Sequence, residues 1–225
     1  MTPTGGVTET WVREALRVHR RYEKEIVEEC GLCPWATRAR TDDKVREFVL
    51  MQTDEALEPS AAAIESLCKD DRIEVAFLIY PRLEIPREDF HAFAARVRDA
   101  EAERRGPGNN PFVLAAFHPD AKPDLSDPER LIPFLRRTPD ATVQLVRGSV
   151  LDHVRSGTPQ GTRFFSMGAF DPTAFVTPAA PPLRERIART NLATTERMGV
   201  DELTRRLDDI RRDRDESYRA LQLRT

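Results

Sequence analysis

The sequence has little of several features that would place it in a special class of protein. Three cysteines among 225 residues are too few and too uneven for an exported scaffold held by disulfides. No apolar run approaches the ~20 residues that a membrane-spanning helix needs, and the longest, residues 75–80, has the length of a strand. Lysine is scarce as well, because nearly all of the 35 basic residues are arginine. A single arginine is therefore weak support for a binding site.

The charge of the chain is almost balanced, with a formal value of −3. A charge this small does not favour nucleic acid or an acidic membrane surface as a partner. The N-terminus has no basic start followed by an apolar core, so we expect no secretory signal. These absences predict a cytoplasmic protein with reduced thiols, and they leave the oligomeric state open.

What is present suits one globular domain with a substantial core. Hydrophobic residues make up 40% of the chain and charged residues 32%, which is typical of a folded domain with a well-solvated surface. We expect a single α/β domain over residues 1–225. Its parts would be N-terminal helices (10–40), an α/β core (45–155), a long loop (156–182) and C-terminal helices (183–222).

The N-terminal part shows helical periodicity. Apolar residues recur at steps of three and four over 10–30, which predicts an amphipathic helix. Gly31 suits the end of this helix, because glycine takes a positive φ without penalty. A second, short helix is expected to begin at Pro34. Cys30 and Cys33 would then lie on the two sides of a corner between helices.

The core alternates between strand-like and helix-like segments. Strands are expected at 47–53, 73–81, 112–117 and 141–146. Helices are expected between them, at 59–69, 86–105 and 131–136. Because a helix between two strands usually carries the chain to a parallel neighbour, this order predicts a mostly parallel four-stranded sheet.

The segment from Cys30 to Ala36 is the most informative one. As the first residue before a helix, Cys33 would meet free N–H groups and the positive end of the helix dipole, which favour a thiolate. An attacking Cys33 with a resolving Cys30 is one interpretation. Burial of both side chains in the core is another, and ligation of a metal or heme by Cys33 is a third.

His118 and Arg147 follow the third and fourth predicted strands, and Arg82 follows the second. Ligands of parallel sheets gather beyond the carboxyl ends of the strands. His118 could there act as a general base or metal ligand, with Asp120 close to it in sequence. Arg147 could hold a carboxylate or phosphate. Alternatively, both residues only stabilise the fold, His118 by capping the strand and Arg147 by pairing with an acid.

The remaining candidates are weaker. Three histidines lie in helical stretches without the spacing of metal ligands, and we expect them to be structural or exposed: His19, His91 and His153. The chain has no phosphate loop, dinucleotide fingerprint, nucleophile elbow or zinc-protease helix. The cofactor is therefore unknown, with a metal or heme still possible.

Several segments together resemble an uncharacterised bacterial family of domains of unknown function (DUF1415-like). The matching residues are Leu-Cys-Pro-Trp-Ala at 32–36, Phe-His-Pro-Asp at 117–120, Arg-Thr-Pro at 137–139, Leu-Val-Arg at 145–147, Ser149, Val150 and, more loosely, Ile187, Arg189, Asn191, Met198 and Gly199. The resemblance implies that Cys33, His118 and Arg147 share a site. It also weakens the dithiol mechanism, because the family usually has asparagine where Cys30 stands. The family has no established activity and does not select a reaction.

We therefore expect a small cytoplasmic enzyme that acts on a small anionic substrate by thiol or acid-base chemistry. Its catalytic residues would be Cys33, His118 and Arg147. The expected substrate-binding residues are Arg82, Asp120, Arg137 and Asn191. One alternative is a metal- or heme-binding protein with Cys33 and His118 as ligands, and another is a non-enzymatic interaction protein.

Overall fold

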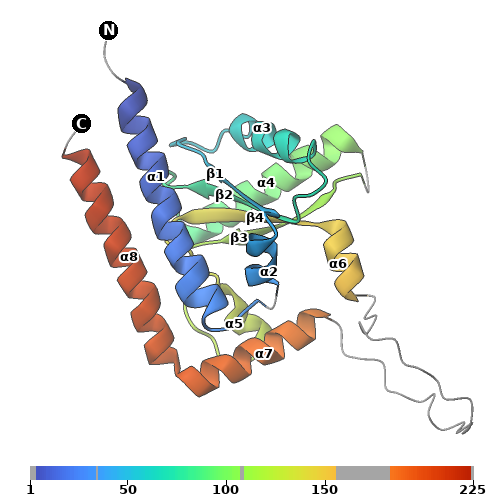
Figure 1. Ribbon diagram of the computed structural model, residues 1–225, viewed down its shortest axis with the longest axis vertical. Helices are drawn as coiled ribbons and strands as arrows, with labels where there is room; N and C mark the ends of the chain where they lie inside the picture. The colour runs from blue at the N-terminus through green and yellow to red at the C-terminus, as the bar shows by residue number, and fades with distance from the viewer. Residues whose placement is uncertain (1–3, 34, 107–108, 156–182, 224–225) are drawn as a thin grey trace, which may run out of the picture.

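The computed structural model describes residues 4–33, 35–106, 109–155 and 183–223 (Figure 1). The loop predicted at 156–182 lies outside the described residues. The α/β class is confirmed, with four strands in one sheet. The strands are β1 (Val45–Val49), β2 (Val75–Tyr80), β3 (Phe112–Phe117) and β4 (Ala141–Arg147).

The sheet is mixed, and the prediction of a mostly parallel sheet is wrong. The strand order is β1-β2-β4-β3, in which β1 and β2 are parallel while β4 is antiparallel to both of its neighbours. The helix between β3 and β4 is α5 (Pro128–Leu135). It does not carry the chain to the other end of the strands. The chain leaves β3 and enters β4 at the same end of the sheet, where Phe117 pairs with Thr142.

The direction of β4 separates residues that a parallel sheet would bring together. The carboxyl ends of β2 and β3 lie at one end of the sheet, where Tyr80 pairs with Ala141. The carboxyl end of β4 lies at the opposite end of the sheet, where Arg147 pairs with Phe112. Residues that follow β3 and β4 are thus at opposite ends of the sheet.

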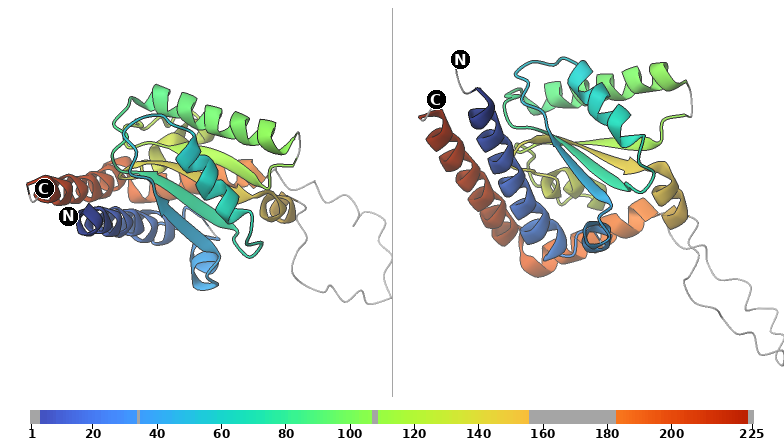
Figure 2. Two further views of the ribbon diagram at one scale, coloured as in Figure 1. Left: turned by 90° about the horizontal axis from the view of Figure 1, so that it is seen from above. Right: turned by 45° about the horizontal axis from the view of Figure 1, so that its top comes forward.

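Helices α3 (Glu58–Leu67) and α4 (Arg87–Arg105) cover one face of the sheet (Figure 2). Alternate residues of the strands point to this face, and their apolar side chains form the largest core cluster with the two helices. Its fully buried aromatic side chains are Tyr80, Phe90 and Phe93.

The other helices lie on the opposite face and beside it. They are α1 (Thr4–Tyr22), the π-helix η1 (Glu23–Glu28), α2 (Ala36–Thr41), α5, α7 (Leu183–Met198) and α8 (Val200–Gln222), with α6 (Gly148–Arg155) following β4. Helices α1 and α8 run side by side in opposite directions, and the described ends of the chain lie close together (Figures 1 and 2). None of the described helices has the length and apolar content needed to cross a membrane.

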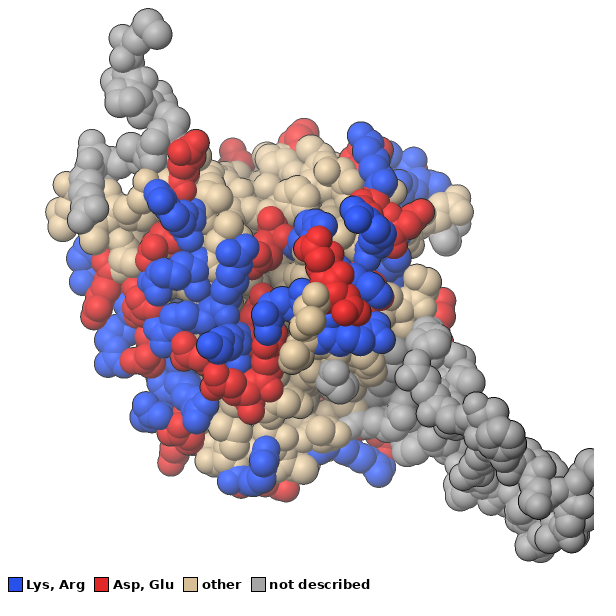
Figure 3. All heavy atoms as spheres, in the orientation of Figure 1, with Lys and Arg blue, Asp and Glu red and all other residues tan. Residues whose placement is uncertain are grey.

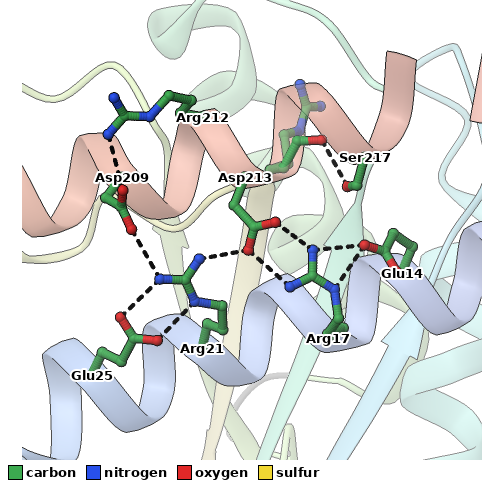
Figure 4. A network of polar contacts seen from close by, with 9 residues as sticks. Glu14, Arg17, Arg21, Glu25, Asp209, Arg212, Asp213 and Ser217 are labelled. Atoms are coloured by element: carbon green, nitrogen blue, oxygen red, sulfur yellow. Dashed lines mark hydrogen bonds and ion pairs between the residues drawn. The ribbon is translucent and has the colours of Figure 1, made fainter. Parts of the chain in front are cut away.

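Charged side chains join α1 to α8. Figure 4 shows Arg17 and Arg21 of α1 pointing toward Asp213 of α8, and Arg21 also reaches Asp209. Basic and acidic side chains are intermixed on much of the surface of this side of the molecule (Figure 3). Two residues along a helix correspond to a turn of about 200°, so the side of α1 away from α8 presents His19 to the sheet. The His19 ring lies 4.9 Å from the ring of Phe77 in β2.

The predicted corner between helices is present with shifted boundaries. The helix predicted at 10–30 corresponds to α1 and η1 together, and Gly31 follows with a φ of 67°. The next helix begins at Ala36 rather than at Pro34. Cys33 therefore lies two residues before the N-cap residue Trp35, although its sulfur still accepts from the N–H groups of Trp35 and Ala36 at the start of the helix.

Candidate functional site

Arg147 is the last residue of β4, at the end of the sheet opposite His118, and its side chain stabilises the turn before β2. Its guanidinium donates from Nε to the carbonyl of Ile73 at 2.7 Å and from Nη2 to the carbonyl of Asp70 at 2.8 Å. The guanidinium carbon also lies 4.7 Å from the centre of the Phe112 ring. The guanidinium of Arg147 is therefore engaged in contacts that stabilise the fold.

His118 is buried at the end of β3, on the face covered by α4. Its Nδ1 accepts from the backbone N–H of Asp120, and its Nε2 donates to the carbonyl of Ile85, each at 3.2 Å. This pattern assigns the proton to Nε2. Burial lowers the pKa of His118, which is therefore neutral at pH 7. Both nitrogens are already engaged, so His118 links two loops and has no free lone pair for a metal.

Cys33 lies on the other face, near η1. Its sulfur accepts from the backbone N–H groups of Trp35 and Ala36, but burial has the larger effect and raises the pKa of the thiol. The charge of Arg136 lowers this pKa and that of Glu23 raises it, each by less than burial does. The structure thus separates Cys33, His118 and Arg147 and does not bring them into one site.

Cys30 has a packing role. Its side chain is buried among apolar residues of η1, α5 and α8, and its thiol donates to the carbonyl of Glu25 at 3.4 Å. Burial raises the pKa of Cys30 as well. All three cysteines of the chain are free thiols.

Two of the predicted substrate-binding residues connect the turn after β3 to α8. Asp120 accepts from Arg211 at 2.6 Å, and Arg137 donates to the carbonyl of Pro119 at 3.0 Å and to Asp208 at 2.8 Å. Each side chain already has a protein partner in α8. They therefore fix the position of this helix.

The other two predicted binding residues lie in different places. Arg82 lines a hollow of about 490 Å³ at the carboxyl end of β2, together with Trp11 of α1 and Tyr218 of α8. Asn191 is buried in α7, and its Oδ1 has no hydrogen-bond partner among the described residues. Among the described contacts, neither Arg82 nor Asn191 touches another of the predicted site residues.

A different group of side chains converges between α1, η1 and β1. Within the part of the chain that the structure describes, one set of three residues has the geometry to hold a metal ion: His19, Glu23 and Glu47. One donor atom from each lies within 4.8 Å of the other two. A first-row ion bound at ~2.0–2.2 Å needs donors roughly 3 to 3.5 Å apart, so small rotations of the glutamate side chains would complete the site.

Local structure accounts for this convergence. His19 and Glu23 are four residues apart, which places them on one side of a helix, one turn from each other. The π-helix begins at Glu23, and its wider turn is closed by the bond from the Glu29 N–H to the Lys24 carbonyl at 3.0 Å. Single π-turns inside longer helices are frequent at functional sites. Glu47 comes from the middle of β1, where its register partner is Phe77.

His19 is the most unusual member of the group. Its side chain is completely buried, yet neither ring nitrogen has a hydrogen-bond partner among the described residues. Burial lowers the pKa of His19 to about 3, so the ring is neutral and offers a lone pair. Leaving a buried polar atom unpaired costs ~1–3 kcal/mol, and an edge contact with Phe77 does not replace a lone-pair acceptor.

The two carboxyl groups differ in their surroundings. The pKa of Glu23 is raised to about 8, mainly by loss of contact with water and in addition by the nearby carboxylates of Glu47 and Glu28. Glu47, whose side chain is 12% exposed, accepts hydrogen bonds from Arg20. Glu23 is therefore protonated at neutral pH until a cation replaces its proton.

One imidazole and two carboxylates form a donor set for a divalent ion. Imidazole suits zinc, iron and nickel, whereas carboxylates suit manganese and magnesium, so a mixed set favours manganese, iron or zinc. Three protein ligands also leave coordination positions open, as in catalytic rather than structural zinc sites. This site was not expected from the sequence, because a lone histidine in a helical stretch is usually structural. The available signal was Glu23, which lies four residues after His19.

Comparison with known proteins gives a family but no activity. The profile of the family described as "Protein of unknown function (DUF1415)" matches residues 14–165, which include all three residues of the cluster. No curated protein and no solved structure matches the chain. Because the match covers more than half of the sequence, the chain belongs to the DUF1415 family of proteins of unknown function.

Proposed function

We propose that this protein binds a divalent first-row transition metal through His19, Glu23 and Glu47. The observation that carries the proposal is the fully buried His19 ring, whose two nitrogens have no hydrogen-bond partner among the described residues while two carboxyl groups lie within 4.8 Å. A bound ion would satisfy one nitrogen and offset the repulsion between the carboxylates. We refer to these three residues as the metal centre.

The proposed ligands replace the pair expected from the sequence. His118 has hydrogen bonds at both nitrogens, and it lies on the face of the sheet opposite Cys33. The two residues cannot jointly hold a metal or heme in this fold. Cys33 is near the metal centre, because the charge of Glu23 acts on its thiol, and it is the member of the predicted catalytic set that this proposal retains.

An enzyme is the activity class that fits a centre with three protein ligands. An ion with open positions can polarise a bound substrate or lower the pKa of a bound water. A small anionic substrate remains our proposal for the ligand class, since an anion can occupy an open position on a cation. The cytoplasm remains the proposed location, supported by the three unpaired thiols.

Metal binding can be tested without knowledge of the substrate. Chelator-treated protein is titrated with Zn²⁺ and Mn²⁺, and bound metal is counted by mass spectrometry after desalting. We expect one ion per chain, and a loss of affinity of roughly 100-fold or more in His19→Ala and Glu23→Gln. Glu23→Gln keeps the size of the side chain, which guards against misfolding as the cause.

His91→Ala is the matched control, because it removes an exposed helical histidine from the other side of the sheet. We expect it to bind metal like the natural protein. If the natural protein took up no ion under these conditions, or if His19→Ala bound one equally well, the proposal would be wrong.

A further inference from the structure

We infer that Arg20 is an internal cation that occupies part of the metal centre in the metal-free protein and leaves when the ion binds. This inference rests on the metal binding proposed above and adds how that binding is regulated. It starts from the carboxylate of Glu47, which has two possible cationic partners. One is Arg20, and the other is the ion.

The Arg20 guanidinium already uses the whole carboxylate of Glu47. Nε lies 3.1 Å from Oε1 and 2.9 Å from Oε2, and Nη2 also donates to Oε2. Two donors on one carboxylate give a fixed, fork-like geometry. A carboxylate held in this way is not free to rotate toward His19.

Arg20 also lies on the solvent side of the cluster. Its side chain is 61% exposed, whereas that of Glu47 is 12% exposed and His19 is fully buried. Arg20 directly follows His19 in α1, so the exposed guanidinium that holds Glu47 belongs to the neighbour of a second proposed ligand.

Charge determines the direction of the effect. A guanidinium and a divalent ion on the same carboxylate repel each other, so ion binding weakens the Arg20–Glu47 pair and favours release of the guanidinium into solvent. Its length and its exposure allow this movement. The Arg20–Glu47 pair therefore competes with metal binding, and the loss of its charge should strengthen binding.

The test compares Arg20→Gln, Arg20→Lys and Arg13→Gln in titrations with Zn²⁺ and Mn²⁺. Arg20→Gln removes the competing charge, and we expect it to bind each ion about tenfold more tightly and to load faster. Arg20→Lys keeps the charge and should stay within about twofold of the natural protein. Arg13→Gln removes the same charge from an exposed position two turns earlier on α1.

Each outcome is informative. Unchanged or weaker binding by Arg20→Gln, with a normal circular dichroism spectrum and metal bound by the natural protein, overturns the competition while leaving the metal centre intact. Equal gains in Arg20→Gln and Arg13→Gln also overturn it, because they would reflect net charge alone. Absence of binding in every variant removes the metal centre and this inference together. Binding by Arg20→Gln at ion concentrations that do not load the natural protein supports both.

Discussion

His19 and Glu23 lie one helical turn apart at the point where α1 becomes a π-helix, with donor atoms within 4.8 Å of each other. Both groups are shifted toward their uncharged forms, the imidazole to a pKa of about 3 and the carboxyl to about 8. Burial is the main cause in both cases, because it penalises the charged form. A divalent ion would offset this penalty for Glu23 by taking the place of its proton.

Metal affinity should depend on pH through Glu23. Its pKa is raised to about 8, so below that pH an ion must displace a proton, and we expect affinity to fall about tenfold per pH unit and to level off above pH 8. The charged groups that face Glu23 are Glu28, Glu47, Arg20 and Arg40. Calorimetry in two buffers of different ionisation enthalpy measures the proton released. An affinity independent of pH below 8 would contradict the prediction.

The same carboxyl should make the metal-free protein less stable as the pH rises from 4.5 to about 8. The pKa of Glu23 is raised from 4.5 to about 8 on folding, so the folded protein holds the proton more tightly and loses stability as the pH rises between these values. Glu23→Gln removes this loss, and we expect it to be more stable than the natural protein by ~1–3 kcal/mol at pH 8, with little difference near pH 4.5. Urea unfolding at the two pH values measures this difference.

Glu29→Gln is the control for that experiment, since Glu29 is exposed in the same segment. We expect it to change stability by no more than ~0.5 kcal/mol at either pH. A similar gain in both variants would show that the general negative charge, and not the burial of Glu23, is responsible.

His118 should matter for stability and not for metal binding. Its ring joins the turn after β3 to the Ile85 carbonyl, so His118→Ala removes a buried ring and leaves two part-buried backbone groups without these partners, and it should cost ~1–3 kcal/mol. The folded variant should bind metal like the natural protein, because the ring lies on the other face of the sheet. If folded His118→Ala lost the ion, this result would contradict the prediction and support His118 as a metal ligand, as expected from the sequence.

Asp140 and Tyr218 should be essential for attaching α8 to the sheet. The Asp140 side chain is completely buried and accepts from the Tyr218 hydroxyl at 2.7 Å and from Arg214 Nε at 2.8 Å. Tyr218→Phe removes one donor from a buried carboxylate and should cost ~1.5–3 kcal/mol in the free energy of unfolding. Arg212→Ala, an exposed change on the same helix, should cost no more than ~0.5 kcal/mol.

Local sequence patterns predicted the elements of the fold well and their spatial relations poorly. The strand expected at 112–117 has these same limits in the structure, and Gly31 has the positive φ that its place at the end of a helix indicates. Alternation and helical periodicity are set by neighbouring residues, so they can be recognised in a single segment. The direction of β4 is not such a property. It depends on the end of the sheet to which α5 leads the chain. The wrong prediction of a parallel β4 is the reason why we expected Arg147 beside His118.

Local patterns in the chain were enough to establish the α/β class, the extent of most helices and strands, and the i, i+4 spacing that puts His19 and Glu23 on one side of α1. The packed fold was needed to establish that β4 runs against its neighbours, that Cys33 and His118 lie on opposite faces, and that Glu47 of β1 meets the helix at His19. These two kinds of property differ in the range of the interactions that produce them. Backbone periodicity is imposed by contacts within a few residues, whereas the metal centre forms where the packing of α1 onto the sheet buries an imidazole beside two carboxyl groups.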